Sequence, residues 1–364
     1  MRTLFVTAVA AVALGVSGSG YARTSQRALP LFTVVPHNVP WHQGAVHPGA
    51  QLTQWNGSFV DQTNATITYT MVGTDPSSTN VTTTTPVVIV PVKMVYGIAN
   101  GKMTFDPKTT RLTNGRTVLR NTLLSPLFAK AVDYVQGGVN LGKTQYVDAF
   151  QRGNFWSLVQ TNSNYHVLLG APKVESEITY KVEPGLGEVM NNPFGSGKVG
   201  TMDVDVFDQE VQMWIKKYSD INPGVLPIFL TYDIYLTQET QCCIGGYHSS
   251  TAGQPSGQTY SYATYVDSVG AFSQDVSALS HELGEWEDDP FVDNSVNCTD
   301  NSLMEVGDPL ETGPNYGAYP YTFKGFTYNL QSLVFIGYFG APPSTSVNSW
   351  LAFQNDESNI CPGQ

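Results

Sequence analysis

The distribution of charge constrains this chain more than any other feature of its sequence. Between Lys217 and Lys324 there is no lysine or arginine, yet these 106 residues hold 15 of the 30 aspartates and glutamates. Ten of those acids fall between Glu282 and Glu311. Carboxylates gathered without basic partners repel one another, and burying one is costly unless something pairs with it. A bound divalent cation would neutralise such a cluster, and a solvated acidic surface is the alternative.

One predicted helix carries residues that could hold such a cation. Over residues 273–289, apolar side chains recur at helical spacing and form a single stripe made of Val276, Leu279, Leu283 and Trp286. His281 and Glu285 are four positions apart on the opposite face, so the two side chains can hold one divalent ion together. Glu282 follows His281 and could reach a water on that ion. A simple His–Glu pair on an amphipathic helix is the alternative.

The string His-Glu-Leu-Gly-Glu at 281–285 is similar to the helix of zinc peptidases, in which His-Glu-x-x-His supplies two ligands and a general base. In this chain Glu285 takes the place of the second histidine of that motif. A glutamate can bind zinc, but its carboxylate favours harder ions such as calcium. A catalytic zinc site needs a third protein ligand, and we predict Glu305 for that role. Asp308 is expected to orient His281 by accepting its other ring N–H.

A second histidine stands in a stretch that is rich in Cys, Gly and Ser. Residues 241–258 are predicted to form a loop between strands at 225–236 and 259–266. Within this loop, His248 could lie near the metal, as a ligand or as a hydrogen-bond donor to bound substrate. A histidine without either role is the alternative.

The remaining patterns predict an α+β fold. Alternating and β-branched residues indicate strands at 66–72 and 84–96, followed by an Asn-Gly hairpin turn at 100–101. Helical spacing or composition indicates helices at 125–134, 146–159 and 203–220.

These elements suggest an organisation in two regions after a signal peptide. We expect a signal peptide at 1–22, a β-rich N-terminal region at 23–200 and a zincin-like metal-binding domain at 201–364. In the last region, the order of backing helix, strand, edge strand and active helix resembles that of the Glu-type zinc peptidases (gluzincins).

Three short motifs carry a further resemblance. Gly-Tyr-His at 246–248, Leu-Ser-His-Glu-Leu-x-Glu at 279–285 and Glu-x-Gly-Asp at 305–308 are similar to motifs of the phosphate-induced (EXORDIUM-like) proteins, a secreted family of plants with bacterial relatives. The similarity covers 232–308, with a weaker echo in 330–353. It implies secretion and a metallopeptidase-like site, but no settled enzymatic activity. The family motifs map onto His281, Glu282, Leu283, Glu285, Glu305, Gly307 and Asp308.

The N-terminus is typical of an exported protein. Arg2 precedes a short apolar run at 4–16, and Gly20-Tyr21-Ala22 offers small residues for signal cleavage. We therefore expect a secreted or periplasmic protein, with an uncleaved membrane anchor as the alternative.

Export predicts disulfides among the four cysteines, Cys242, Cys243, Cys298 and Cys361. A bridge between the two adjacent cysteines would strain the peptide between them. We therefore expect each of these two to pair with one of the two distant cysteines, and free buried thiols are the alternative.

The charge and the motifs together limit the classes of function that this protein can have. The net charge of −12 argues against nucleic acid or an anionic membrane surface as a partner. We expect a secreted metal-dependent hydrolase that acts on a peptide or protein substrate, with His281, Glu285 and Glu305 as zinc ligands and Glu282 as the base. One rival is an extracellular binding or structural protein with a structural metal, for which calcium would suit the many carboxylates. A glycoside hydrolase is a weaker rival, because no spacing singles out a carboxylate pair.

Overall fold

The computed structural model describes residues 28–34, 50–239, 241–298, 302–357 and 359–361. The predicted signal peptide at 1–22 lies outside the described residues. Among the described residues, no helix combines the length and apolar character needed to span a membrane. Strands and helices both form, and the fold class is α+β, as the sequence predicts.

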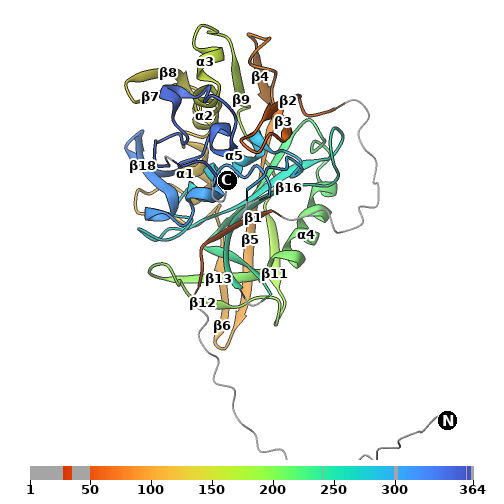
Figure 1. Cartoon of the computed structure of the whole chain (residues 1–364). Coiled ribbons are helices and arrows are strands. Elements are labelled where there is room, and N and C mark those ends of the chain that lie inside the picture. Colours follow the sequence, from red (N-terminus) through yellow and green to blue (C-terminus); the bar gives the residue numbers. More distant parts are fainter. Residues whose placement is uncertain (1–27, 35–49, 240, 299–301, 358, 362–364) are drawn as a thin grey trace, which may run out of the picture.

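An 11-stranded mixed sheet organises the molecule. Its strands are β1 (Leu31–Val34), β5 (Val87–Ile98), β6 (Gly101–Phe105), β10 (Lys173–Val174), β11 (Ile178–Val182), β12 (Val189–Asn191), β13 (Lys198–Asp203), β14 (Leu226–Tyr232), β15 (Ile234–Gln238), β16 (Gln241–Ser250) and β17 (Thr259–Tyr265). The main path runs β10-β5-β14-β17-β16-β15-β13-β12, while β1 joins β16, and β6 and β11 join β5. β5, β14 and β17 are parallel neighbours, and β16 runs antiparallel to β17. The predicted N-terminal and C-terminal regions therefore both contribute strands to this sheet (Figure 1).

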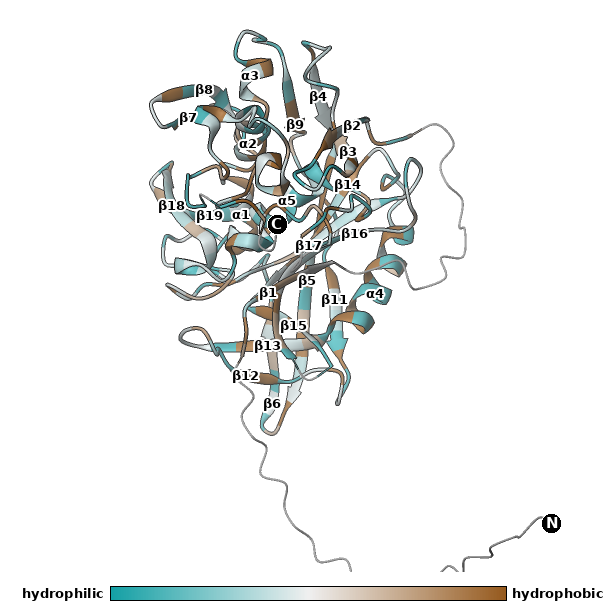
Figure 2. Cartoon of the chain, in the orientation of Figure 1, coloured by the Kyte–Doolittle hydropathy of each residue, from teal (hydrophilic) through white to brown (hydrophobic). Residues whose placement is uncertain are grey.

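Two helices cover opposite faces of the sheet, α4 (Val204–Lys217) and α5 (Ser277–Asp288). Successive residues of a strand point to opposite faces, and in β14 the buried Ile228 packs in the core that contains α5, while the adjacent Phe229 packs in the core that contains α4. Figure 2 shows hydrophobic and hydrophilic residues alternating along α4, as expected of a helix with one face on a sheet.

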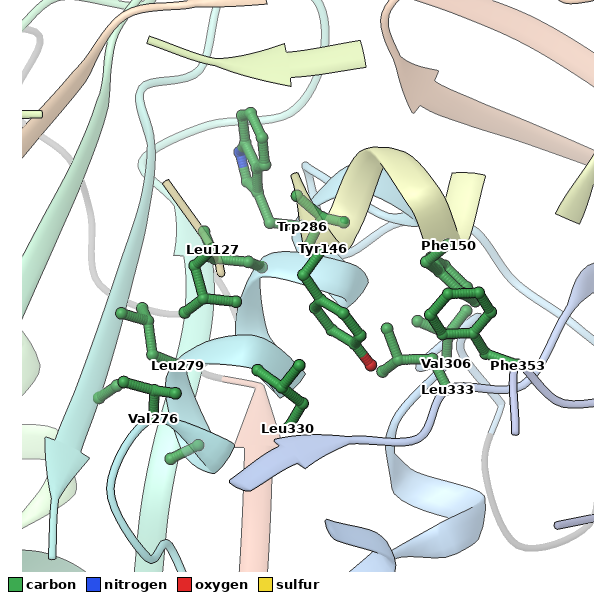
Figure 3. Close-up of a cluster of buried hydrophobic side chains, with 14 of the residues drawn as sticks. Leu127, Tyr146, Phe150, Val276, Leu279, Trp286, Val306, Leu330, Leu333 and Phe353 are labelled. Atoms are coloured by element: carbon green, nitrogen blue, oxygen red, sulfur yellow. The ribbon is translucent and has the colours of Figure 1, made fainter. Parts of the chain in front are cut away.

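The smaller elements share the core of α5. They are the paired strands β2 (Gln54–Val60) and β3 (Thr66–Val72), β4 (Thr82–Thr85) and β9 (His166–Leu169), β7 (Val132–Gln136) and β8 (Val139–Thr144), β18 (Ala318–Phe323) and β19 (Phe326–Gln331), with the helices α1 (Val118–Leu123), α2 (Tyr146–Asn154) and α3 (Trp156–Val159). Leu279 and Trp286 of α5 pack there beside Tyr146 and Leu330 (Figure 3). All twelve residues of α5 are buried, so its polar residues have no solvent to face.

Most of the predicted elements around the site are confirmed. The helices predicted at 203–220 and 273–289 are α4 and α5, and the strand predicted at 259–266 is β17. The strand predicted at 66–72 is β3, and the Asn-Gly turn joins β5 to β6 as an antiparallel hairpin.

Three predicted elements are wrong, and the helix predicted at 146–159 is divided at Phe155 into α2 and α3. The helix predicted at 125–134 ends in strand β7, where buried and exposed residues alternate with the period of a strand. The strand predicted at 225–236 is two strands, because Asp233, with φ at 51°, breaks the extended backbone between β14 and β15. The loop predicted at 241–258 contains strand β16, whose glycines permit close packing against other elements. A Cβ atom on Gly245 would lie 1.9 Å from Ser273 Oγ.

The predicted cysteine pairing is also wrong. Cys242 is bonded to its neighbour Cys243 within β16, and Cys298 is bonded to Cys361. The peptide between the adjacent cysteines is cis, which brings their two Cα atoms to 3.0 Å from each other and both side chains to the same side of the chain.

The packing of α4 on the sheet gives a first test. Ile215, on the buried face of α4, is 5% exposed, whereas Met213 on the same helix is 54% exposed. We expect Ile215→Ala to lower the free energy of unfolding by about 2–5 kcal/mol, through lost burial and a residual cavity. Met213→Ala should change it by less than about 0.5 kcal/mol. Chemical denaturation of both variants checks this, and equal effects would contradict the assignment of the buried face.

Candidate metal centre

Three elements bring the predicted site residues together around α5. α5 supplies two carboxylates and one imidazole, β16 supplies a second imidazole, and the segment that follows α5 supplies two more carboxylates. We call this set the carboxylate–histidine cluster; its members are His248, His281, Glu282, Glu285, Glu305 and Asp308. All are buried except Asp308, which is partly exposed.

Hydrogen bonds to the backbone position the chain that returns to α5 after the helix ends. The Asp289 carboxylate accepts the N–H groups of Asp293 and Asn294, and the Asn294 side chain donates to the carbonyl oxygen of Asp288. The Gly307 N–H then donates to Glu285 Oε1 at 3.1 Å, which attaches the 305–308 segment directly to the helix. Glu305 thus reaches the cluster although it is distant from α5 in sequence.

The ring of His281 is held between Phe32 and two carboxylates. Its Nε2 lies 2.8 Å from Glu285 Oε1 and 3.3 Å from Asp308 Oδ1. The Phe32 ring stacks on it with centroids 3.7 Å apart. Asp308 therefore lies at the same ring nitrogen as Glu285, whereas we expected it at the opposite nitrogen. The opposite nitrogen, Nδ1, faces Gly307, where an added Cβ atom would be only 2.3 Å away.

His248 makes the most informative contacts of the cluster. Its Nε2 lies 3.1 Å from the carbonyl oxygen of Asp289, which can only accept a hydrogen bond, so Nε2 carries a proton. Its Nδ1 faces three buried carboxylate oxygens, of Glu282 at 3.5 Å, Glu285 at 3.6 Å and Glu305 at 3.9 Å. In the neutral ring, Nδ1 then carries no proton, and its lone pair of electrons points at three carboxylates. A histidine that binds a metal commonly donates its other ring N–H to a backbone carbonyl in this way.

The donor atoms form two overlapping groups that share Glu285. The ligand atoms of His248, Glu285 and Glu305 all lie within 4.8 Å of one another, and so do those of His281, Glu285 and Asp308. The predicted ligands His281 and Glu305 thus both lie beside Glu285, but in different groups. His248, predicted as either a ligand or a substrate contact, is in the group that contains Glu305.

Electrostatics in the cluster follow from burial and from the two histidines. Burial raises the pKa of Glu305 well above its ordinary value and that of Glu282 to about 8. Burial opposes the charged form of His248, but Glu305, Glu282 and Glu285 raise its pKa well above the ordinary value. Burial also acts to raise the pKa of Glu285, yet His281 and His248 hold it below its ordinary value. Without a cation, the cluster must therefore retain protons that a divalent ion would displace.

The residues fit a divalent cation. Within the described part of the chain, both carboxylate oxygens of Glu282 and of Glu305 and the Nδ1 of His248 are buried without a hydrogen-bond partner. No lysine or arginine occurs between Lys217 and Lys324 to neutralise them from nearby in the sequence. Imidazole nitrogen with carboxylate oxygen is a donor set that zinc accepts, and the excess of oxygen also suits calcium.

The other acids of α5 do not join this cluster. Asp288 accepts a hydrogen bond from Gln151 of α2. Burial raises the pKa of Glu287 well above its ordinary value, and Asp148 of α2 adds to the effect. The clustering of acidic residues in the sequence therefore indicates which helix carries the site. It does not indicate which way each acidic side chain points.

Two contacts of the site were missed from the sequence. Nothing in the sequence indicates that Phe32 lies against His281, because residues 28–34 carry no motif. The close packing of two glycines did have a signal, because Gly246 lies two positions before His248 and Gly307 directly precedes Asp308. A Cβ atom on Gly246 would lie 2.5 Å from Glu282 Oε1. Glycines at these positions let the backbone approach the helix closely.

Comparisons with known proteins add no relative. No family model, no curated protein and no solved structure matches the chain. The resemblance to the phosphate-induced proteins stays an expectation from the motifs alone.

The close approach of Gly307 to His281 gives a second test. In Gly307→Ala the new methyl group would overlap His281 Nδ1 and force a buried ring to move. We expect a loss of about 1–3 kcal/mol in the free energy of unfolding. Gly97→Ala is the control, because a Cβ atom there meets nothing within 4 Å. Equal unfolding midpoints for the two variants in denaturant would show that the glycine is not required.

Proposed function

We propose that the chain is a secreted metal-dependent hydrolase, peptidase-like in mechanism, with one divalent metal at the carboxylate–histidine cluster. The observation that carries the proposal is the orientation of His248, whose Nε2 donates to a backbone carbonyl while Nδ1 faces three buried carboxylates. Such an arrangement is stable only if a cation or protons occupy the space between these groups.

Three donors define the proposed metal position. His248 Nδ1, Glu285 and Glu305 are mutually close, and the oxygens of Glu305 have no hydrogen-bond partner among the described residues. His281 contacts the other oxygen of Glu285, where it orients that carboxylate or completes the set of ligands. Three protein ligands are what a catalytic zinc site uses, with a further position left open.

Glu282 is the proposed proton acceptor. When bound, a divalent metal would supply Lewis-acid polarisation of a substrate carbonyl and would lower the pKa of a water. Glu282 Oε2 is 3.5 Å from His248 Nδ1, and neither carboxylate oxygen has a hydrogen-bond partner among the described residues, so the side chain is free to take a proton. It is not a member of either close ligand group. Asp308 meanwhile restrains the ring of His281 from the partly exposed side.

A second candidate function rests on the burial of the donors. His248 is fully buried and Glu305 is 2% exposed. A metal in this position would join α5, β16 and the 305–308 segment, and could serve the fold alone. In this reading the protein is an extracellular binding or structural protein, and calcium is the expected ion.

Metal binding is tested with single substitutions of the donors. We expect about one equivalent of zinc in protein purified without added metal, measured by elemental analysis. His248→Ala and Glu305→Ala should lower zinc affinity by more than about 100-fold, because each removes a ligand. His281→Ala and Asp308→Asn should lower it by about 10–100-fold, as expected of residues that orient ligands.

The relative losses of zinc affinity in these variants distinguish the ligand set proposed here, which contains His248, from the set predicted from the sequence, which contains His281. If His281→Ala loses the metal and His248→Ala keeps it, the set predicted from the sequence replaces the one proposed here. Calcium in place of zinc would favour the structural function, and protein that binds neither ion would contradict the proposal.

The role of Glu282 separates a hydrolase from a structural metal protein. Glu282→Gln keeps the size of the side chain but removes its ability to accept a proton. We expect the variant to keep its metal and to lose about 10²–10⁴-fold of peptidase activity, measured on a mixed peptide library. Unchanged activity, or loss of the metal, would contradict the assignment of Glu282 as the base.

A further inference from the structure

The short strand β1 occupies the edge of β16 next to the cluster. Its pairing is parallel, with Leu31 opposite Ile244 and Val34 opposite His248 itself. Just before the strand, the Leu29 N–H donates to the Cys242 carbonyl at 2.8 Å. A segment near the N-terminus therefore lies along the strand that carries His248, which pairs with β17 as well.

Phe32 is the side chain that anchors this segment. It is 5% exposed, and its ring stacks on His281 and packs 4.8 Å from the Phe272 ring. Its backbone N–H donates to Glu311 Oε2 at 3.0 Å rather than to a strand neighbour. Leu29 offers a contrast, because its backbone bonds to β16 while its side chain is 49% exposed.

Two features make this occupant replaceable. The strand has four residues, and parallel pairing is slightly weaker per residue than antiparallel pairing. The covalent attachment of β1 to the chain opposes its replacement by another peptide, because a tethered strand has a high effective concentration at its own site. A free peptide should therefore compete poorly until the anchor is weakened.

We propose that the edge of β16 beside the cluster is a binding site for an extended peptide with an aromatic anchor residue, and that residues 29–34 occupy this site as an internal inhibitor. The mode is strand addition, in which main-chain hydrogen bonds supply affinity and one side-chain pocket supplies selectivity. Phe272 and His281 line that pocket around the Phe32 ring, and Glu311 accepts the N–H of the anchor residue. The proposal rests on the proposed function, for which it names the substrate class and the means of inhibition.

Peptide binding to the full chain tests this directly. The probe is a fluorescein-labelled peptide with the sequence of residues 28–35, Ala-Leu-Pro-Leu-Phe-Thr-Val-Val, followed by fluorescence anisotropy. Every sample carries Glu282→Gln, so that hydrolysis does not interfere. We expect Phe32→Ala in the chain to tighten binding of the probe at least tenfold, because the internal strand loses its anchor. Leu29→Ala is the matched control and should bind the probe as the parent does.

A second probe tests the anchor pocket. The same peptide with alanine in place of its phenylalanine should bind the Phe32→Ala chain at least tenfold more weakly. The proposal is wrong if the Phe32→Ala chain still unfolds in one cooperative transition, which shows that it is folded, but binds the probe no better. It is also wrong if the two probes bind equally. Should Phe32→Ala fail to fold, Phe32→Leu keeps apolar volume without the aromatic ring, and an intermediate gain in binding is expected.

Metal content and peptidase activity are measured separately on the chains without Glu282→Gln. Peptide binding as expected, in protein that holds no metal or hydrolyses nothing, would overturn the proposed function and leave the peptide site standing. Metal and activity as expected, with no gain from Phe32→Ala in binding or in the rate of peptide hydrolysis, would overturn the peptide site alone.

Discussion

Buried negative charge without lysine or arginine nearby in the sequence is the constraint on which the rest of this structure depends. Each carboxylate removed from water carries a desolvation cost that only a cation, a proton or several hydrogen bonds can offset. Along α5, different groups offset this desolvation cost for different carboxylates. Gly307 donates its N–H to Glu285, Gln151 donates to Asp288, and the two imidazoles stand where the remaining oxygens converge. The surrounding elements pack so as to keep these contacts in place.

The sheet makes this convergence possible by carrying α5 on one face and α4 on the other. Because β16 lies beside β17 under α5, its side chains on that face point at the helix, and His248 is one of them. The glycines of β16 bring the strand close enough for Glu282 to lie over Gly246. A helix that is buried on all sides can then present its His–Glu pair to a strand instead of to solvent.

Sequence patterns predicted the helix and the residue types of the site better than they predicted its shape. His281 and Glu285 share a face because helical spacing requires it, and the apolar stripe with Trp286 identified the side of α5 that packs in the hydrophobic core. Two features could not be derived in this way. The strand around His248 was hidden, because Gly245-Gly246 has the composition of a turn and its real use is close packing against other segments. The contact of Phe32 with His281 joins distant segments, and no local pattern encodes it.

The pairing of β1 has a consequence for how the protein is made. Phe32 donates its N–H to Glu311, a residue 279 positions later in the chain. Synthesis proceeds from the N-terminus, and pairings between distant segments form slowly, so β1 is made long before β16 and Glu311, which hold it in place. An exposed strand edge is a point at which other chains can pair. Until β1 docks, the part of the β16 edge that it covers stays open to pairing with other chains.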